Sequence, residues 1–437
     1  MKIRSWLSTC TTSTATNAAV PHTSKHSVSD QSSVFDMATS SSSSASSSNN
    51  SSPSIQSNLS LQTLPSVPSL QTSLSAETLT VSYACLASLE PCLPKQPITC
   101  VAVHQSLLYV ASAHEFNVYD RTANYSHLDA FNGNDSSSGS IKAVVFTDGK
   151  LFTAHQDCKI RVWRVSTTAK TKTNKRYKLL TTLPTVNDRL RRFILPKNYV
   201  NVRRHKKRLW IEHSDAVTGL AVNNGMIYSV SWDRSLKIWR TSDLRCVESV
   251  KAHDDAINAI AVSPDGTVYT GSADKRIRVW AKPEGEKRHA LVATIEKHKS
   301  AVNALALNDD GSVLFSGSCD RSILVWERED SANHMAVSGA LRGHERAILC
   351  LFNVSDLLLS GSADRTVRIW RRGDEGRYCC LGVLGGHAKP VKSLVAVMEE
   401  RDSNGVVLNL FSGSLDGQTK VWQVLVSRPN SVTATIS

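Results

Sequence analysis

Beyond about residue 80, short apolar stretches alternate with polar positions at a period of two and end in turn-forming residues. The stretch AINAIAV at 256–262 is followed by the turn SPDG, and the pattern returns with turns such as NDDG. A period of two places successive side chains on opposite faces, as in a β-strand, and such turns bring the chain back as an antiparallel neighbour. The pattern therefore predicts a series of small β-meanders.

Six segments end on a tryptophan that follows an aspartate by six positions, as in GSADKRIRVW and GSCDRSILVW. A Ser or Thr stands four positions before each aspartate, and a histidine precedes five of the six units. The five full sets are His213, Ser229, Asp233 and Trp239; His253, Thr270, Asp274 and Trp280; His298, Ser316, Asp320 and Trp326; His344, Ser360, Asp364 and Trp370; and His387, Ser412, Asp416 and Trp422. Most of the tryptophans are 41 to 52 residues apart, which is the length of a four-stranded propeller blade.

These units resemble WD40 repeats, as in the transducin β subunit, with the final Asp of the name replaced by Arg, Ala, Glu or Gln. A degenerate further copy at 98–120 has Tyr119 in the tryptophan place and Ala113 in the aspartate place. The resemblance predicts an all-β fold, a seven-bladed propeller over residues 80–425. In this family a strand from the start of the domain completes the last blade, and residues 84–90 are expected to do so here.

The segments outside the propeller are polar. Residues 1–79 are dominated by Ser, Thr, Asn and Gln and are predicted to be a disordered tail, and residues 426–437 a short flexible one. Residues 1–29 lack any acid, so a plastid or mitochondrial transit peptide is the alternative for the first part. No apolar run is long enough to cross a bilayer.

The segment TLPTVNDRLRRFILPKNYVNVRRHKKRLW, together with the blade that follows it, is similar to a plant WD-repeat group named after Jingubang. That resemblance implies a plant regulatory protein of the cytoplasm and nucleus, without catalytic activity.

The net charge of +13 is local, because residues 165–210 carry 14 Lys or Arg and one acid, Asp188. This basic insertion separates the second and third repeat cores. Its densest cluster predicts a nuclear import signal or a site for an acidic partner and consists of Arg203, Arg204, Lys206, Lys207 and Arg208. Anionic lipid and RNA stacked on Tyr177 and Trp210 are further candidates. Alternatively, residues 199–212 are the outer strand of blade 2, where Lys and Arg would prevent strand pairing.

Hydroxyl, imidazole and carboxylate are also the groups of a hydrolase triad. An enzyme needs one such set, whereas a set in every blade favours a structural hydrogen-bond network. The sequence contains no Gly-rich phosphate loop and no H-E-x-x-H, and its ten cysteines show no zinc-finger spacing, so neither catalysis nor a cofactor is expected. Blade 2 lacks the histidine, with Ser137 near its place, and blade 1 lacks Trp and Asp, so these blades are expected to be the least rigid.

The candidate partner surface lies on the turns that carry the repeat aspartates. Trp232 precedes one of these aspartates, where the other full blades have smaller or polar residues such as Leu415. The residue after the aspartate is basic in four consecutive blades: Arg234, Lys275, Arg321 and Arg365. Such turns share one face of a propeller, so we expect this top face to bind a protein with an acidic surface or motif, on a monomeric propeller. The alternatives are packing of Trp232 over the neighbouring blade and ordinary solvated charges.

Two other function classes compete with a protein-interaction scaffold. A substrate receptor of a cullin-type ubiquitin ligase is one, although such receptors usually carry W-D-x-R, and the residues after the six tryptophans here are Arg164, Arg240, Ala281, Glu327, Arg371 and Gln423. An RNA- or chromatin-associated propeller that uses the basic insertion is the other.

Overall fold

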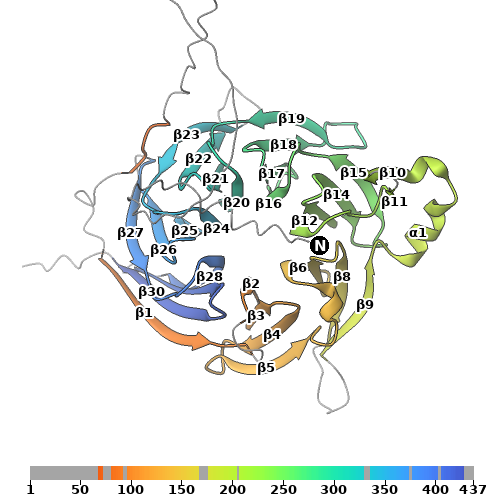
Figure 1. Cartoon of the computed structure of the whole chain (residues 1–437). Coiled ribbons are helices and arrows are strands. Elements are labelled where there is room, and N and C mark those ends of the chain that lie inside the picture. Colours follow the sequence, from red (N-terminus) through yellow and green to blue (C-terminus); the bar gives the residue numbers. More distant parts are fainter. Residues whose placement is uncertain are drawn as a thin grey trace, which may run out of the picture. The chain divides into compact units, whose positions relative to one another are not determined.

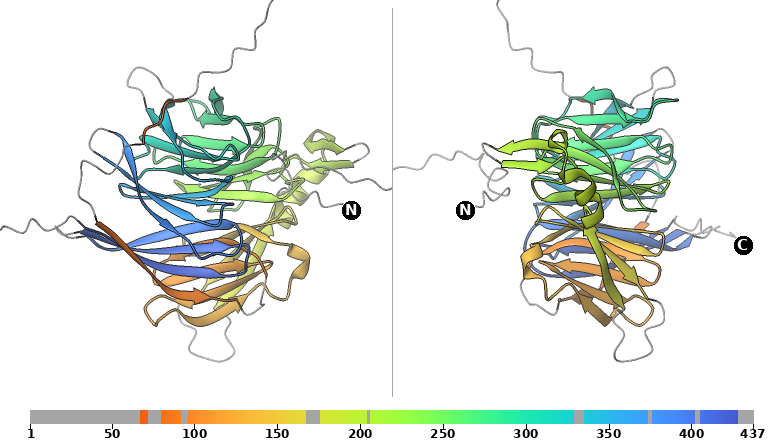
Figure 2. Two further views of the ribbon diagram at one scale, coloured as in Figure 1. Left: turned by 60° about the vertical axis from the view of Figure 1, so that its left-hand side comes forward. Right: turned by 90° about the vertical axis from the view of Figure 1, so that its right-hand side faces the viewer.

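The computed structural model describes residues 67–71, 80–91, 96–166, 176–203, 206–328, 335–373, 376–401 and 405–427. Within these residues the chain forms seven four-stranded antiparallel sheets, arranged as blades around a common axis, so the predicted seven-bladed propeller is confirmed (Figure 1). The first strands of neighbouring blades lie side by side around the axis, and the fourth strands lie on the rim (Figure 1). Figure 2 shows the same ring from two sides, with the yellow-green insertion projecting from it. Of the predicted tails, residues 1–66, 72–79 and 428–437 lie outside the described residues, whereas Val426 and Ser427 belong to the last strand, so the expected start of the C-terminal tail at 426 does not hold.

The first four blades follow one another along the chain. Blade 1 consists of β2 (Ile98–His104), β3 (Leu107–Ser112), β4 (Glu115–Asp120) and β5 (Ser126–Phe131). Blade 2 consists of β6 (Ile141–Thr147), β7 (Lys150–His155), β8 (Ile160–Val165) and β9 (Tyr177–Leu183). Blade 3 consists of β12 (Val217–Asn223), β13 (Met226–Ser231), β14 (Ser235–Arg240) and β15 (Cys246–Lys251). Blade 4 consists of β16 (Ile257–Val262), β17 (Val268–Ser272), β18 (Ile277–Ala281) and β19 (Ala290–Ile295).

The last three blades complete the ring. Blade 5 consists of β20 (Val302–Leu307), β21 (Val313–Ser318), β22 (Ile323–Arg328) and β23 (Met335–Leu341). Blade 6 consists of β24 (Ile348–Val354), β25 (Leu357–Ser362), β26 (Val367–Arg372) and β27 (Tyr378–Leu384). Blade 7 consists of β28 (Val391–Arg401), β29 (Gly405–Ser414), β30 (Thr419–Ser427) and β1 (Thr80–Leu89).

The ring is closed by the strand expected from the sequence. β1 pairs antiparallel with β30, with Leu89 opposite Thr419 and Thr80 opposite Ser427. The predicted closure by residues 84–90 is therefore confirmed, and the strand begins earlier than expected. A strand from the beginning of the domain thus covers an edge that blade 7 would otherwise expose.

Neighbouring blades approach so closely that some strand positions have no room for a side chain. A Cβ on Gly317 of β21 would lie 2.5 Å from the Cγ2 of Ile348 in blade 6, and one on Gly413 of β29 would lie 2.6 Å from Ile98 in blade 1. These glycines directly follow the Ser of the repeat. They allow the first strand of the next blade to pack against the sheet.

A short segment that the sequence placed in the tail lies on the rim. Residues 67–71 form bridges to Ala340 of blade 5 and Tyr378 of blade 6, and Leu70 packs against the core that these blades share. The Ala340 amide donates to the Pro68 carbonyl at 2.9 Å, and the Tyr378 amide donates to the Leu70 carbonyl at 2.9 Å. The expected tail boundary at residue 79 therefore does not hold for these five residues.

The basic insertion contains structure of its own. A short α-helix, α1 (Val186–Phe193), and a 3-10 turn, η3 (Pro196–Asn198), lead into a separate hairpin of β10 (Tyr199–Arg203) and β11 (Lys206–Leu209). The expectation that residues 199–212 form the outer strand of blade 2 is wrong, because β9 pairs with β8 in that place. Tyr177–Leu183 occupies this edge with Tyr177 and Leu183 buried, and α1 and the hairpin lie outside the blade sheets. A second short 3-10 turn, η2 (Ser136–Ser138), precedes blade 2.

Candidate functional site

Five blades contain the same hydrogen-bonded network, which joins the loop before the first strand to the second and third strands. Histidine Nδ1 lies 2.7–3.1 Å from the aspartate Oδ2, and Nε2 lies 2.8 Å from the Ser or Thr hydroxyl. The tryptophan indole N–H donates to the same hydroxyl at 2.8–3.1 Å. Because the carboxylate favours the proton on Nδ1, the hydroxyl donates to Nε2 and accepts from the indole. The structure thus brings together each of the five sets of four residues.

Blade 6 shows how each carboxylate is held. Asp364 accepts hydrogen bonds from His344, from the Thr366 hydroxyl and from the backbone amides of Glu345 and Thr366. Burial alone would raise the pKa of Asp364, but the hydrogen bonds from His344 and Thr366 outweigh it and hold that pKa well below its usual range. In blade 4 the same balance lowers the pKa of Asp274 to about 2.

The hydroxyls of these networks are wholly buried. Ser229, Thr270, Ser316, Ser360 and Ser412 are each 0 % exposed. A nucleophile must reach its substrate, whereas each of these oxygens is already engaged by an indole and an imidazole. The geometry therefore favours a structural role over a hydrolase triad.

Blade 2 lacks the histidine of the preceding loop, as expected, but it builds its network from a different histidine that the sequence analysis missed. Thr153 accepts from the Trp163 indole at 3.0 Å and lies 2.7 Å from Nε2 of His155, which stands two residues further along the same strand. The carboxylate of Asp157 instead binds the buried Arg161 at 2.9 Å, and Arg161 also binds Asp135 at 2.6 Å.

The signal for this change was present in the sequence. His155 occupies the place where the other blades have the second Ser of their Ser-Gly-Ser or Ser-Val-Ser stretch, or its Thr-Gly-Ser counterpart. Ser137 does not replace the histidine, because it is exposed and donates to Asp135 at 2.6 Å. Its nearness in sequence to the expected position was coincidental.

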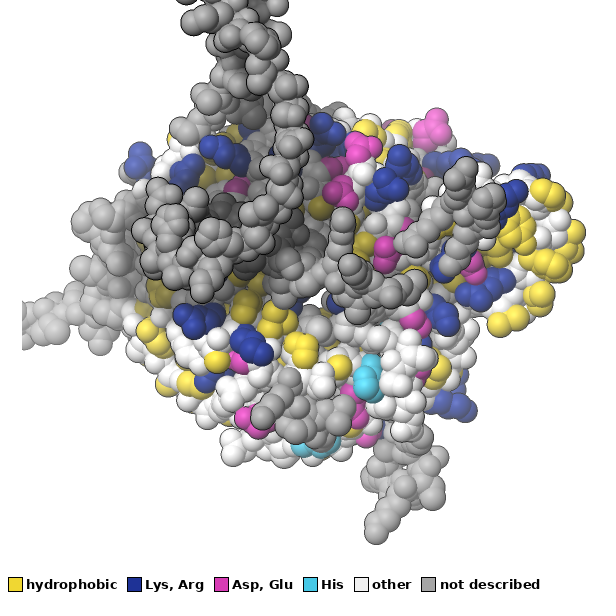
Figure 3. All heavy atoms as spheres, viewed as in Figure 1, with side chains coloured by type: hydrophobic (Ala, Val, Ile, Leu, Met, Phe, Trp, Pro, Cys, Tyr) yellow, Lys and Arg dark blue, Asp and Glu magenta, His cyan; other side chains and the backbone are white. Residues whose placement is uncertain are grey.

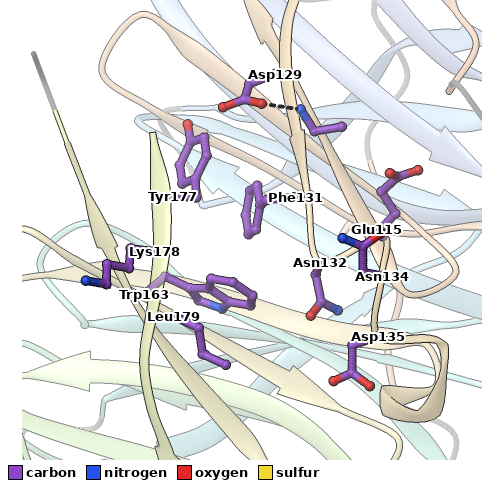
Figure 4. Close-up of a pocket in the computed structure, with 12 residues that line it drawn as sticks. Glu115, Asp129, Phe131, Asn132, Asn134, Asp135, Trp163, Tyr177, Lys178 and Leu179 are labelled. Atoms are coloured by element: carbon purple, nitrogen blue, oxygen red, sulfur yellow. Dashed lines mark hydrogen bonds between the residues drawn. The ribbon is translucent and has the colours of Figure 1, made fainter. Parts of the chain in front are cut away.

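Blade 1 replaces the polar network with aromatic packing shared with blade 2. The Tyr119 hydroxyl donates to the Glu90 carbonyl at 3.1 Å, just beyond β1. Phe131 stacks on Phe116 and on Tyr177, with ring centroids 5.0 and 4.3 Å apart, and meets Trp163 edge-on at 5.1 Å. A pocket of about 780 Å³ opens over these rings, with Glu115 and Asp129 at its sides (Figure 4). Because the rings mainly face one another, we assign this cluster to the core.

The four basic turn residues lie at one structural position. Each occupies the left-handed turn between the second and third strands of its blade, with φ between 70° and 74°. All four side chains are exposed: Arg234, Lys275, Arg321 and Arg365. Among the described residues, Arg234 donates to the Asp254 carbonyl at 3.3 Å, and no side-chain hydrogen bond or ion pair is formed by the other three.

Trp232 is less accessible than the sequence suggested. It is half-buried, and the Lys142 ammonium from blade 2 lies 5.7 Å from the centroid of its ring. Burial, with repulsion from Lys392, lowers the pKa of Lys142 to about 8. Leu415, at the equivalent place in blade 7, is also half-buried. Trp232 therefore packs partly over the neighbouring blade, whereas the four basic turn residues are exposed.

Comparison with known proteins agrees with this architecture. A family model described as "WD domain, G-beta repeat" matches residues 205–240, 244–281, 289–327, 336–371 and 378–423. The chain belongs to the WD40-repeat family. The five matches cover the repeats with the complete network, while blades 1 and 2 lie outside them.

Individual WD40 relatives match over short stretches. The small ribosomal subunit protein RACK1y of Oryza sativa is 37% identical over 68 residues, which are 15% of this chain and 20% of the rice protein. RACK1 of Drosophila melanogaster is 30% identical over 70 residues, or 16% of this chain and 22% of the fly protein. An F-box/WD-40 repeat-containing protein of Arabidopsis thaliana is 33% identical over 73 residues, which are 17% of this chain and 13% of the Arabidopsis protein. The chain thus matches less than a quarter of the length of each, and the likeness concerns the repeats.

The two aromatic residues considered for RNA stacking in this WD40 protein are already occupied. Tyr177 is 4 % exposed and stacks on Phe131. The Arg192 guanidinium lies 4.5 Å from the ring centroid of Trp210. Neither residue therefore offers a free ring face of the kind that base stacking needs.

The basic cluster of the insertion lies on the β10–β11 hairpin. Lys207 is exposed, and Arg208 donates to the His213 carbonyl at 2.7 Å. Arg204 lies outside the described residues, and the side chains of Arg203 and Lys206 are not described either. The described helix is too short to cross a membrane. Nor does the described part of the chain gather three or more His, Cys, Asp or Glu side chains at a possible metal site.

Proposed function

We propose that this propeller is a non-catalytic scaffold that binds an acidic segment of a partner protein on its top face. The observation that carries the proposal is the arc of Arg234, Lys275, Arg321 and Arg365, exposed at one turn position in four consecutive blades. None of these four cations forms an ion pair with described residues, so an incoming carboxylate would not have to displace an internal one. WD40 propellers typically act in protein interactions and are generally non-catalytic.

The regulatory setting is part of the same proposal. The likeness of the insertion to the Jingubang-type group supports a regulatory protein of plants that works in cytoplasm and nucleus. The basic cluster on β10 and β11 supports nuclear import. A reporter fused to residues 165–212 is expected to concentrate in nuclei and to lose that distribution when the Lys and Arg residues at 203–208 are neutralised. An unchanged distribution would contradict import through this cluster.

The experiment for the scaffold compares partners recovered by affinity purification. Lys275→Glu combined with Arg321→Glu should remove the top-face partner, with its recovery falling at least tenfold. Arg240→Glu combined with Arg328→Glu is the matched control, because both residues end third strands and thus lie on the opposite face. Each pairs with a surface carboxylate, Asp243 and Asp265, and exposed pairs of this kind contribute little to stability. Identical partner sets for the wild type and the top-face variant would refute the proposal.

A further inference from the structure

Helix α1 presents its apolar residues to solvent, which is the reverse of an ordinary surface helix. Val186, Leu190 and Phe193 follow the i, i+4, i+7 spacing of one helical face, and they are 70, 55 and 51 % exposed. Ile194 and Leu195 extend the apolar surface with exposures of 72 and 45 %. Among the described residues, seven of the sixteen large apolar side chains that are exposed lie between positions 186 and 200. Contiguous exposure of this kind marks an interaction site.

The opposite face of the helix attaches it to blade 3. Asp188 is 1 % exposed; its carboxylate accepts from Arg192 at 3.0 Å and from the Cys246 amide of β15 at 3.2 Å. Arg192 also donates to the Cys246 carbonyl at 3.2 Å. The Thr185 hydroxyl caps the helix by accepting from the Asp188 amide at 3.1 Å. The apolar face is thus held outward by polar contacts on the inner face, and it does not result from a frayed helix.

The surroundings of this apolar surface are cationic. Arg191 and Lys197 are exposed beside it, and Lys207 is exposed on the adjoining hairpin. The only acid of residues 165–210 is the buried Asp188, and this segment accounts for the entire net charge of the chain. Figure 3 shows hydrophobic and basic side chains together where α1, β10 and β11 project beside blade 3.

We infer that this arm, residues 185–203 and 206–209, binds the surface of a bilayer that contains anionic phospholipids. Side chains as exposed as Val186 and Ile194 project from a convex surface, and a bilayer accepts them without a preformed pocket. The headgroups supply a uniform negative surface that matches basic side chains with no exposed acid among them. An acidic protein would need a groove of matching shape. The arm lies on the rim, at β15, so lipid binding does not use the top-face residues.

The test measures sedimentation of the full-length protein with vesicles at physiological salt. Wild type is expected to bind phosphatidylcholine vesicles containing about a third phosphatidylserine at least tenfold more tightly than pure phosphatidylcholine vesicles. Val186→Glu combined with Ile194→Glu should weaken this binding at least tenfold, and Arg191→Glu combined with Lys197→Glu should do the same. Because these residues are exposed, none of the changes should unfold the protein.

Two matched controls separate the arm from other surfaces. Leu291→Glu changes an exposed leucine on the outer strand of blade 4, 47 % exposed, and should leave vesicle binding unchanged. Lys275→Glu removes a top-face cation and should also leave it unchanged. Failure of wild type to sediment with the anionic vesicles would overturn the inference, as would undiminished binding of the Val186/Ile194 variant. Retention of wild type on immobilised polyglutamate that is lost in the Arg191/Lys197 variant, without vesicle binding, would assign the arm to an acidic protein and also overturn it.

Discussion

Blades 3 to 7 and blades 1 and 2 solve the same packing problem with different chemistry. In the first group an imidazole, a hydroxyl, a carboxylate and an indole join the strands in one polar network, as in His344, Ser360, Asp364 and Trp370. In the second group Phe131 packs against three aromatic rings. Blade 2 keeps an imidazole, a hydroxyl and an indole in His155, Thr153 and Trp163, but its carboxylate binds Arg161. The third strand of each blade is thus held in place by side-chain contacts, and the chemistry of these contacts differs between the two groups.

This comparison changes the expectation for rigidity. Blades 1 and 2 were expected to be the least rigid because network members are missing from their sequences. The aromatic cluster and the ion pairs of Arg161 replace those contacts, so the expectation now depends on whether the substitutes are as strong. Mutations that remove one element from each group measure this directly.

The largest effect is expected for Phe131→Ala. Phe131 is 7 % exposed and touches Phe116, Trp163 and Tyr177, so truncation leaves a cavity at the junction of blades 1 and 2. The free energy of unfolding should fall by about 3 to 5 kcal/mol, as for other buried Phe→Ala changes. Urea denaturation followed by tryptophan fluorescence measures it. Phe193→Ala, at a side chain 51 % exposed, is the control and should change stability little. A loss below about 1 kcal/mol for Phe131→Ala would show that the cluster does not hold these blades.

A smaller but clear loss is expected for Asp364→Ala in blade 6. The change leaves His344 Nδ1 and the Thr366 hydroxyl without their acceptor, at a cost of about 1 to 3 kcal/mol for a buried group. The thermal midpoint should drop, and His344→Ala should lower it similarly. Asp356→Ala is the control in the same blade, because its carboxylate is 30 % exposed and pairs only with Arg371 at the surface. Unchanged midpoints for both network variants would contradict a stabilising role.

The difference between the two groups also explains what the sequence predicted well. The repeat register is strict in blades 3 to 7, so the Asp-to-Trp spacing identified the strands and the four partners of each network. In blade 2 the partner histidine is His155, which lies within a strand. The repeat pattern places the histidine in the preceding loop, so it does not identify His155. Residues 199–212 alternate well enough to resemble a strand. Both segments could pair with β8 as judged from sequence alone, and the structure shows that Tyr177–Leu183 does so.

The partner surface was harder to predict for a different reason. Whether Trp232 is accessible depends on Lys142 in another blade, and the outward apolar face of α1 depends on Asp188 binding the backbone of blade 3. Both contacts join residues that are distant in sequence. Local patterns therefore gave the blades but not the exposure of these side chains.

A pH-dependent loss of stability is expected from His155 in blade 2. Burial and the nearby Arg161 lower the pKa of His155 to about 3 from an ordinary value of 6.5. As the pH falls below 6.5, the imidazole becomes protonated in the unfolded chain but stays neutral in the folded one. The contribution of neutral His155 to the free energy of unfolding is therefore fully present above pH 6.5 and is lost as the pH falls toward 3. It amounts to about 2 kcal/mol between pH 6.5 and 5. His155→Gln should flatten the fall in stability across that interval, whereas His127→Gln, at an exposed site, should not. Parallel curves for wild type and His155→Gln would contradict this.

The smallest effect tests the polar contact that blade 1 retains. Tyr119→Phe keeps the ring and removes the hydroxyl that donates to the Glu90 carbonyl, where the closing strand β1 ends. The expected loss is about 0.5 to 1.5 kcal/mol, the usual contribution of one hydrogen bond, measured by urea denaturation. Tyr83→Phe is the control, because its hydroxyl bonds the Val383 carbonyl at an exposed site, 3.3 Å away. If Tyr119→Phe costs no more than Tyr83→Phe, aromatic packing alone fixes blade 1, and the contrast with the polar networks of blades 3 to 7 becomes complete.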